Sequence, residues 1–387
     1  MAELTVGGIG VKPKAVLVSN TSWYIYNFRR GLVVSLRERG FEVCVVTPSD
    51  EYSPRLVDLG CKHFPITMDN KGSNPIRDAM TILDFYRLYG SIKPHLIYQN
   101  TIKPNIYGSI AAGLLGIPVI NTITGLGTAF LKDDLRQKLV RMLYRISQRG
   151  AFRIFFQNEE DQRMFVQAGL VPAGRDVYIP GSGVDLQRFD FKPLAERSSL
   201  RFLLIARLLR DKGVVEYVEA ARMLKRKYPE AEFQLLGFLD ADNHSAVSRE
   251  EVDQWVAEGV VNYLGKTDNV VPFMEAADCV VLPSYREGLP KTLIEAAAVG
   301  RPLVATDVVG CRDVVKDGFN GFLCEAKSAQ SLADALERML GLSLPQRQLL
   351  ADNGRRFVEE KYDERLVIRK YMACAEQLVQ PGAWAGS

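Results

Sequence analysis

The residues of this sequence that are best suited to chemistry include two glutamates separated by seven residues. Glu287 and Glu295 belong to the stretch SYREGLPKTLIE (284–295), which follows an expected strand. Pro290 favours the first turn of a helix, where a missing amide hydrogen leaves nothing unsatisfied. We therefore expect Glu287 in the turn before a helix and Glu295 more than one turn inside it. One carboxylate can then face a sugar, and the other can accept hydrogen bonds from ribose hydroxyls.

A second cluster of candidate residues is basic. Arg207 and Lys212 flank a loop between an expected strand and the next helix. Two cations in such a loop can neutralise a diphosphate leaving group, and arginine can bind it through two parallel hydrogen bonds. The first amides of the helix after Pro290, around Lys291–Leu293, add the positive end of a helix dipole, which also suits a phosphate. The alternative for both stretches is an ordinary solvated surface.

These residues need a scaffold of parallel strands to position them. Short β-branched runs alternate with helical periodicity along the chain, which favours an α/β fold of two Rossmann-like parallel-sheet domains facing a cleft. The expected strands are Ala15–Ser19, Glu42–Thr47, Leu96–Tyr98, Val119–Ile123, Ile154–Phe156, Arg201–Ala206, Glu232–Leu236, Cys279–Leu282 and Pro302–Ala305. The expected helices are Tyr26–Arg39, Ile76–Ile92, Leu135–Gln148, Val214–Lys227, Pro290–Val299 and Glu364–Leu378. Ligands of such sheets bind at the carboxyl ends of the strands.

The domain boundary is expected in the polar run Lys192–Arg197, after a glycine-bearing stretch. We predict an N-terminal domain over 1–192 and a C-terminal domain over 193–363. A helix over 364–380 is expected to return to the first domain, and 381–387 is expected to be a tail.

Composition excludes several classes of protein. The 387 residues are 47% hydrophobic and 25% charged, as in soluble globular proteins, so collagen, coiled coil and disorder are excluded. The longest apolar stretch, 109–120, is shorter than the ~20 residues of a membrane-spanning helix. Because the start shows no signal-peptide pattern, we expect a cytoplasmic protein. Three histidines and six scattered cysteines form no metal-site or disulfide pattern.

Taken together, the charged residues resemble a known family. Glu287 and Glu295 match the E-x7-E signature of the family-4 glycosyltransferases of the GT-B fold, and Arg207 with Lys212 match their donor-diphosphate pair. Further matches lie at 265–268, 277–278, 300–302, 307–312 and 317–321. The chain is most similar to PglA-type and capsule-type bacterial enzymes that act on undecaprenyl-diphosphate-linked sugars.

The resemblance implies a retaining hexosyltransferase without a metal or other cofactor. It would move a sugar, best matched by α-linked N-acetylgalactosamine, from a UDP-sugar to an undecaprenyl-diphosphate-linked saccharide in protein glycosylation or surface polysaccharide synthesis. Arg207 and Lys212 would hold the diphosphate, Glu295 the ribose, and Glu287 the hydroxyls of the donor sugar. The remaining donor-binding residues would be Gly288, Leu289, Pro290, Lys291, Thr292 and Leu293, with Tyr263, Leu264 and Gly265 near the base. Fixed cations on the leaving group would lower the barrier, because negative charge develops there.

The sequence departs from the family pattern at two places in its first half. Many relatives have a Gly-Gly pair after the first strand, where this chain has SNTSWY (19–24). Many also have a first-domain histidine near the reacting carbon, where this chain has ITGLG (123–127), and position assigns none of its three histidines to that role. The second departure fits a front-face mechanism in which the departing phosphate takes the acceptor proton.

Candidate acceptor residues lie in two stretches of the N-terminal half, which carries 22 basic against 16 acidic residues over 1–185. Asn100–Asn105 and Thr124–Thr128 each follow an expected strand. Lys103 or Arg29 could meet an acceptor diphosphate, and the alternative for each is a solvated loop cation. The acceptor-side residues we predict are Arg29, Lys103, Asn105, Thr124 and Gly125.

A basic helix suggests a membrane surface. Lys138, Arg141, Arg145 and Arg149 recur at helical spacing, and Leu135, Leu139, Leu143 and Ile146 lie on another face. One interpretation is a helix packed on the core through its leucines, with a solvated basic face. The other is contact with anionic lipid on the inner face of the bacterial membrane, with a shallow aromatic contribution from Phe85 and Tyr86.

The expected partners are thus a UDP-sugar, a polyprenyl-diphosphate-linked saccharide and an anionic membrane surface, without nucleic acid. Three alternatives stay open at this level. They are a UDP-sugar 2-epimerase of the same architecture, a transferase with a soluble acceptor, and a catalytically silent nucleotide-sugar-binding subunit. The E-x7-E string argues against the epimerase, and the complete set of four charged residues argues against the silent subunit.

Overall fold

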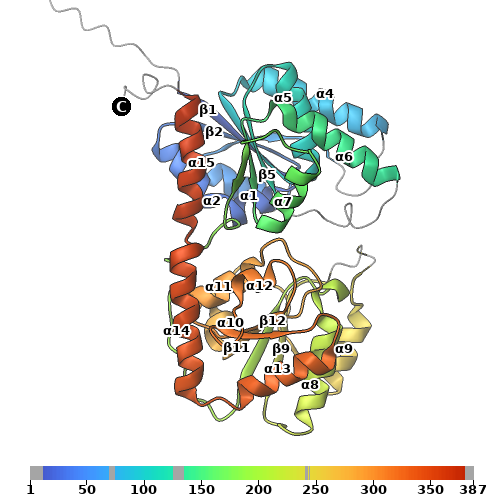
Figure 1. The fold of residues 1–387 in the computed structure, drawn as a ribbon, viewed down its shortest axis with the longest axis vertical. Helices are drawn as coiled ribbons and strands as arrows, with labels where there is room; N and C mark the ends of the chain where they lie inside the picture. The colour runs from blue at the N-terminus through green and yellow to red at the C-terminus, as the bar shows by residue number, and fades with distance from the viewer. Residues whose placement is uncertain (1–11, 69–74, 125–134, 240–242, 244, 380–387) are drawn as a thin grey trace, which may run out of the picture. The chain divides into compact units, whose positions relative to one another are not determined.

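Strands pair only in parallel, in two separate sheets, throughout the part of the chain that is described. The computed structural model describes residues 12–68, 75–124, 135–239, 243 and 245–379, and the side chains of 135–137 are not included. The chain divides into unit 1, residues 1–182 with 365–387, and unit 2, residues 183–364 (Figure 1). The expected α/β class with two Rossmann-like sheets is confirmed.

The sheet of unit 1 has seven strands in the order β3-β2-β1-β4-β5-β6-β7. The strands are β1 (Lys14–Val18), β2 (Glu42–Thr47), β3 (Lys62–Pro65), β4 (Leu96–Asn100), β5 (Val119–Ile123), β6 (Arg153–Phe156) and β7 (Asp176–Tyr178). The helices are α1 (Ser22–Phe28), α2 (Arg30–Glu38), α3 (Ser53–Asp58), α4 (Pro75–Ile92), the π-helix η1 (Pro104–Gly108), α5 (Ser109–Leu114), α6 (Leu135–Ser147), the 3-10 helix η3 (Gln148–Gly150), α7 (Glu159–Gln167) and α15 (Glu364–Leu378).

Alternation along the central strands builds two cores in unit 1, because successive side chains of a strand point to opposite faces. Val16 and Val18 of β1 pack in the cluster that contains α4, α5, α6 and α7. Ala15 and Leu17 pack in the cluster that contains α1, α2, α3 and α15. Both faces of the sheet are therefore covered by helices, as a parallel sheet requires.

The sheet of unit 2 has six strands in the order β10-β9-β8-β11-β12-β13. The strands are β8 (Arg201–Ile205), β9 (Glu232–Leu236), β10 (Asn262–Tyr263), β11 (Cys279–Leu282), β12 (Leu303–Thr306) and β13 (Gly321–Cys324). The helices are the 3-10 helix η4 (Arg210–Lys212), α8 (Val214–Lys225), α9 (Arg249–Ala257), α10 (Val271–Ala276), α11 (Lys291–Val299), α12 (Cys311–Val314), α13 (Ala329–Leu340) and α14 (Leu344–Lys361).

The division between the units falls at 182/183, ten residues before the predicted boundary at 192/193. The reason is packing, since Val184 and Phe189 are buried in the core of unit 2. The Val184 amide also donates to the Tyr362 carbonyl over 2.8 Å, and the Glu364 amide donates to the Val184 carbonyl over 3.0 Å. The two places where the chain passes between the units are thus hydrogen-bonded to each other.

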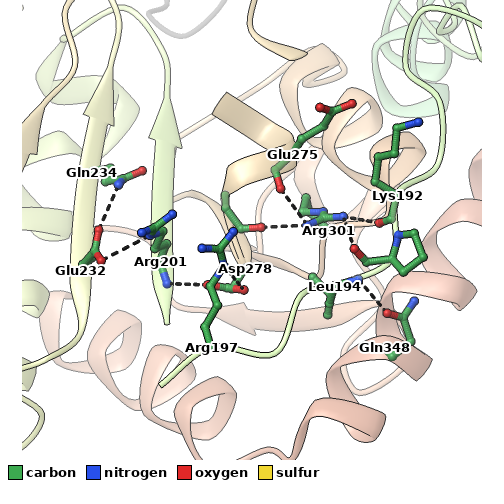
Figure 2. Close-up of polar contacts among 12 residues, drawn as sticks. Lys192, Leu194, Arg197, Arg201, Glu232, Gln234, Glu275, Asp278, Arg301 and Gln348 are labelled. Carbon is green, nitrogen blue, oxygen red and sulfur yellow. Dashed lines mark hydrogen bonds and ion pairs between the residues drawn. The ribbon is translucent and has the colours of Figure 1, made fainter. Parts of the chain in front are cut away.

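A buried guanidinium holds the segment that enters unit 2. Arg301, 2% exposed, donates to the carbonyls of Lys192, Glu275 and Ala277, the last over 3.0 Å (Figure 2). Burial lowers the pKa of Arg301 to about 10, and the nearby carboxylate of Asp278 opposes this effect. The 300–302 motif therefore has a structural role, which is to attach the linker to the sheet.

The last helix, α15, packs on unit 1. The Tyr98 hydroxyl donates to the carbonyl of Tyr371 over 2.9 Å, and the Tyr371 hydroxyl lies 2.7 Å from the hydroxyl of Thr122. Arg39 and Glu376 form an ion pair at 2.6 Å on the surface. None of the described helices has the length and apolar content that a membrane crossing needs.

We expect Arg301→Met to lower the free energy of unfolding by about 3–5 kcal/mol, because several buried carbonyls lose their donor at once. Arg163→Met is the matched control, since it removes an arginine whose side chain is 70% exposed and forms a surface helical pair with Glu159. That control should stay within about 0.5 kcal/mol of the wild type. Urea unfolding followed by circular dichroism measures both, and equal effects of the two substitutions would contradict the role given to Arg301.

Candidate functional site

The strand order of unit 2 reverses between β8 and β11. From β8 the chain proceeds outward to β9 and β10, whereas from β11 it proceeds to β12 and β13 on the other side. Ligands of open parallel sheets bind at such a reversal, beyond the carboxyl ends of the strands. The loop after β8 (206–213) and the loop after β11 (283–290) begin there, and these two loops carry Arg207, Lys212 and Glu287.

The two loops are joined through their backbones. The Tyr285 amide donates to the Asp211 carbonyl over 2.9 Å, and the Ser284 hydroxyl donates to the same oxygen over 3.2 Å. Gly213 has a left-handed φ of 71°, and a Cβ at this position would overlap the Pro283 carbonyl oxygen. The end of the first loop therefore has a fixed position against the start of the second.

The structure brings Lys212 and Glu287 together. The Lys212 Nζ donates to a Glu287 carboxylate oxygen over 2.6 Å, and the two side chains are only 20% and 15% exposed. The backbone of Glu287 is held in turn by the segment after β12, because its amide donates to the Val309 carbonyl over 3.3 Å. Gly310 lies against the same turn, where a Cβ would press on the carbonyl oxygens of Glu287 and Gly288.

Arg207 lies at the start of the loop after β8, and its side chain is exposed. Its carbonyl accepts a hydrogen bond of 2.7 Å from the Leu209 amide, which forms a tight turn directly after the strand. Lys212 follows within the short 3-10 helix η4. Both predicted diphosphate ligands thus belong to one compact loop at the reversal of the sheet.

Helix α11 begins at Lys291, one residue later than predicted, and Pro290 is its N-cap with extended backbone. The Pro290 carbonyl accepts hydrogen bonds from the amides of Leu293 and Ile294, over 3.1 and 3.3 Å. The prediction of a free Leu293 amide for an anion was therefore wrong, because the first turn closes tightly after the proline. Thr292 lies half-buried in that turn, and Leu289 packs against the core.

Glu295 lies one turn inside α11, with a side chain that is 13% exposed. Burial raises the pKa of its carboxyl group, and the charges of Lys291 and Arg188 oppose this effect. The Lys291 Nζ lies 3.6 Å from a Glu295 carboxylate oxygen. The carboxylate is therefore accessible over a small area only, as suits a single hydrogen-bonded ligand group better than a solvated surface.

The predicted base-binding residues lie beside the loop that carries Arg207. The Tyr263 hydroxyl donates to the Gly237 carbonyl over 2.9 Å, and the Gly237 amide donates to the Gly265 carbonyl over 2.8 Å. A Cβ on Gly237 would overlap the carbonyl oxygen of Ala206. Leu264 packs into the core. The ends of β8, β9 and β10 thus meet closely at one edge of the sheet.

Sequence reasoning missed one pair that supports this site. The Tyr285 hydroxyl donates to Glu216 in the first turn of α8 over 2.6 Å, and burial raises the pKa of Tyr285. The contact connects a loop residue with a helix residue 69 positions away in the sequence, so no local spacing indicates it. The 307–312 motif matches the family pattern, but its spacing does not indicate the contact with Glu287.

Arg29 does not present its charge to solvent in unit 1. It is 3% exposed, donates to the Asn100 side chain over 3.0 Å and to the Phe28 carbonyl over 2.9 Å, and lies over the rings of Tyr24 and Tyr371. The prediction that it meets an acceptor diphosphate is therefore replaced by a structural role. A buried guanidinium with these partners fixes α1 and α15 on the sheet.

The other acceptor-side candidates are also engaged. Lys103 forms an ion pair of 3.1 Å with Asp78, with both side chains mostly buried. Asn105 is 1% exposed and donates to the Thr122 carbonyl over 2.8 Å. Thr124, half-buried, directly follows β5, whereas Gly125 lies outside the described residues. Of these, Thr124 is the one at the carboxyl edge of the sheet with an accessible side chain.

The predicted basic face of α6 is partly engaged by the protein itself. Lys138 and Arg149 are exposed, and Arg141 is half-buried. Arg145 donates to the carbonyls of Ala168 and Gly169, over 3.1 and 3.2 Å, and so binds the end of α7. Leu143 packs on the core as expected, but Leu139 and Ile146 are exposed, so the interpretation of a single core-facing stripe was wrong for them. Leu135 lies outside the described side chains.

Comparison with known proteins decides the family. The model of glycosyl transferases group 1 matches residues 187–357, and the model of glycosyl transferase 4-like domains matches residues 14–158, so together they match most of the chain. The chain belongs to the family-4 glycosyltransferases. The first of these matches contains every charged residue of the site in unit 2.

Two relatives of this glycosyltransferase have names that state an activity. An N,N'-diacetylbacillosaminyl-diphospho-undecaprenol alpha-1,3-N-acetylgalactosaminyltransferase of Campylobacter jejuni is 28% identical over 94% of this chain and 98% of its own length. A UDP-Gal:alpha-D-GlcNAc-diphosphoundecaprenol alpha-1,3-galactosyltransferase of Escherichia coli is 27% identical over 68% of this chain and 71% of its own.

Solved structures support the GT-B fold of the glycosyltransferase. Anabaena Alr3699/HepE in complex with UDP has a TM-score of 0.76 at 19% identity, with 95% of this chain and 100% of that chain covered. A sucrose-phosphate synthase from Thermosynechococcus elongatus has a TM-score of 0.75 at 20% identity, with 95% and 99% covered. At these identities the likeness concerns the fold alone.

Gly213→Ala should move Lys212 as well as destabilise the unit. The substitution adds a left-handed φ penalty of about 1–2 kcal/mol and an overlap with the Pro283 carbonyl. Gly259→Ala is the matched control, because Gly259 has a φ of 69° and no atom within 4 Å of a Cβ. We expect the Gly213 variant to unfold at clearly lower urea concentration than the Gly259 variant. Equal midpoints would contradict the close contact between the loops.

Glu295→Gln should stabilise the protein at high pH and not at low pH. The buried carboxyl group has a raised pKa, so its favourable contribution is complete below the unfolded value of about 4.5 and is lost as pH rises through the folded value. Glutamine remains neutral throughout. The melting temperature of the variant should therefore exceed that of the wild type at pH 8 and approach it toward pH 4.

The control for this measurement is Glu359→Gln, which removes an exposed carboxylate from a helical pair with Arg355. It should show no gain at pH 8, since surface pairs contribute little. A Glu295→Gln protein that melts below the wild type at pH 8 would show that the Lys291 pair outweighs burial.

Proposed function

We propose that this enzyme is a retaining glycosyltransferase that moves a sugar from a UDP-sugar to an undecaprenyl-diphosphate-linked saccharide at the cytoplasmic face of a bacterial membrane. α-Linked N-acetylgalactosamine is the proposed sugar, because the Campylobacter relative carries that transfer in its name and aligns over nearly the full length of both chains. The pathway would be protein glycosylation or surface polysaccharide synthesis. The UDP complex of the Anabaena structure and the UDP-Gal of the Escherichia coli relative support a UDP donor.

The observation that carries the proposal is the Lys212–Glu287 pair at the strand reversal of unit 2. An ammonium and a carboxylate 2.6 Å apart offer adjacent sites for an anion and for hydroxyl groups. A sugar diphosphate has these two kinds of group on neighbouring atoms, since the phosphate is bonded to the anomeric carbon of a polyhydroxylated ring. The pair thus matches the donor around the bond that must break.

In the proposed reaction the bond from the anomeric carbon to the β-phosphate oxygen breaks, and the electron pair leaves with UDP. Lys212 Nζ and the Arg207 guanidinium stabilise the negative charge that develops on the diphosphate. Glu287 orients Lys212 and accepts hydrogen bonds from the donor sugar, and Glu295 accepts them from the ribose.

On the same face of the sugar, the acceptor hydroxyl oxygen forms its bond to the anomeric carbon, and its proton passes to the departing phosphate. Retention of configuration follows, and no protein base is needed on the acceptor side. We also propose that no metal takes part. Among the described residues, no group of three or more His, Cys, Asp or Glu side chains is placed to hold an ion. Lys212 and Arg207 would supply the positive charge on the diphosphate instead.

UDP release from a panel of UDP-sugars tests the proposal, with and without a polyprenyl-diphosphate-linked N-acetylhexosamine acceptor and with EDTA present. We expect release that depends on the acceptor and occurs with one donor. Release without acceptor and with change of the sugar would indicate an epimerase. Acceptor-dependent release only with a water-soluble saccharide would overturn the lipid-linked acceptor, and loss of activity in EDTA would overturn metal independence.

Lys212→Ala should lower kcat by about 10²–10³, as expected for loss of one preorganised charge on the leaving group. The loss in the free energy of unfolding should be smaller than the loss in transition-state stabilisation, because both side chains of the Lys212–Glu287 pair keep part of their surface accessible to water. Lys227→Ala is the matched control, since Lys227 is another ion-paired lysine of unit 2 that lies just after α8 and pairs with Glu337. A Lys212→Ala enzyme with wild-type kcat at saturating donor would remove Lys212 from the chemistry.

A further inference from the structure

Helix α4 has an apolar stripe on its outer side. Ile76, Met80 and Leu83 are spaced by four and three residues and therefore lie along one face of the helix. Their exposed fractions run from 45% to 75%. The opposite face of α4 packs on the core of unit 1 through Phe85 and Tyr89, which are both fully buried. The stripe is therefore additional to the apolar face that folding requires.

Helix α6 has a similar stripe. Leu139, Met142 and Ile146 are spaced by three and four residues and are 46% to 57% exposed. The helix meets the core instead through Tyr144, with Val140 and Leu143 partly buried beside it. An apolar stripe on the solvent side of a helix that already has a packed face indicates a second partner.

The two stripes belong to one layer of unit 1. Helices α4, α5 and α6 contribute to the same core cluster on one face of the sheet, and Figure 1 shows them together on that side. Eight of the seventeen large apolar side chains that are exposed in the described residues lie on these three helices. They are Ile76, Met80, Leu83, Tyr86, Leu114, Leu139, Met142 and Ile146. The rest are scattered over other elements, as is normal for a protein surface.

The charges in this layer are mainly positive. Helix α6 and η3, from 135 to 150, contain no acidic residue. Lys138 and Arg149 are exposed, and helical geometry places them beside the apolar stripe. On α4, Arg77 and Arg87 are exposed. The two acidic residues of that helix are each near a cation, Asp78 with Lys103 at 3.1 Å and Asp84 with Arg87 at 3.9 Å.

We propose that the outer face of α4, α5 and α6 docks on an anionic lipid bilayer. The apolar stripes enter the boundary between headgroups and acyl chains, while Lys138, Arg149 and Arg87 contact lipid phosphates. The combination of exposed large apolar side chains with adjacent exposed cations is that of a helix lying in a membrane interface. Here the apolar stripes lie on two helices, α4 and α6, that both pack on the sheet of unit 1. The proposal does not depend on the transferase reaction, because binding is measured without donor or acceptor.

The test is flotation of the full chain with vesicles of phosphatidylcholine alone or with added phosphatidylglycerol. The first variant is I76S/M80S/L83S and the second is K138E/R149E. The matched control is V57S/V256S/L349S, which removes three apolar side chains of comparable exposure from other elements. All these positions are exposed, so melting temperatures should remain close to that of the wild type.

We expect the wild type and the control to float with the phosphatidylglycerol vesicles, and each test variant to bind them about tenfold or more weakly. Raising the salt concentration should weaken vesicle binding of the wild type toward that of the charge-reversal variant, because the contribution of the cations is screened. A wild type that does not bind anionic vesicles, or an apolar-stripe variant that binds as the wild type does, would overturn the proposal.

Light scattering distinguishes lipid docking from the other possible use of this face, which is contact with a second copy of the chain. A wild type that is dimeric and an I76S/M80S/L83S variant that is monomeric, with equal lipid binding, would overturn the proposal in favour of self-association. A monomer in both cases, with lipid binding lost in the variant, supports it.

Discussion

The contact between the loop after β8 and the loop after β11 is the constraint on which the chemistry of unit 2 depends. Gly213 has no side chain and lies against the carbonyl of Pro283, and the Asp211 carbonyl accepts from both Tyr285 and Ser284. Neither loop can move alone without breaking these contacts. These backbone contacts fix the relative positions of Lys212 and Glu287. The two side chains are therefore held close enough to form their ion pair.

The corresponding edge of unit 1 is built differently. Its strand order also reverses, between β1 and β4. The polar groups that follow these strands satisfy one another, as Arg29 does with Asn100 and Asn105 does with Thr122. In unit 2 the charged groups at the reversal keep part of their surface accessible. Unit 2 is therefore the part whose charged groups at the strand reversal remain accessible, and the polar residues of unit 1 mainly fix its own helices.

The central strands and most long helices could be predicted from sequence, because β-branched runs and helical periodicity are local signals. All four edge strands, β3, β7, β10 and β13, were missed, since KHFP, DVY, NY and GFLC are two to four residues long and contain no β-branched run. The four charged residues proposed for the donor site could be named from the sequence because their spacing is a motif. Their supports could not, because Tyr285–Glu216 and Glu287–Val309 are contacts between distant segments.

Burial was the property that sequence predicted least well. Arg29 was expected to be available to a ligand, although aromatic rings and a side-chain amide enclose it. One of the two interpretations of α6 packed Leu139 and Ile146 inward, but Tyr144 occupies the core-facing position instead. In both cases the residue type fits either environment, and only the neighbouring elements decide between them.

The Lys212–Glu287 pair also has a consequence for selectivity against small anions. In the resting protein the ammonium already has a built-in counter-ion at 2.6 Å, so the charge that a free phosphate ion would meet is largely cancelled. Such an ion can approach Lys212 only by bringing its own negative charge close to Glu287, which is unfavourable at short range. A ligand that carries hydroxyl donors next to its phosphate satisfies the carboxylate while it binds the ammonium. We therefore expect the pair to bind inorganic phosphate, or a nucleoside diphosphate that carries no donor sugar, only weakly.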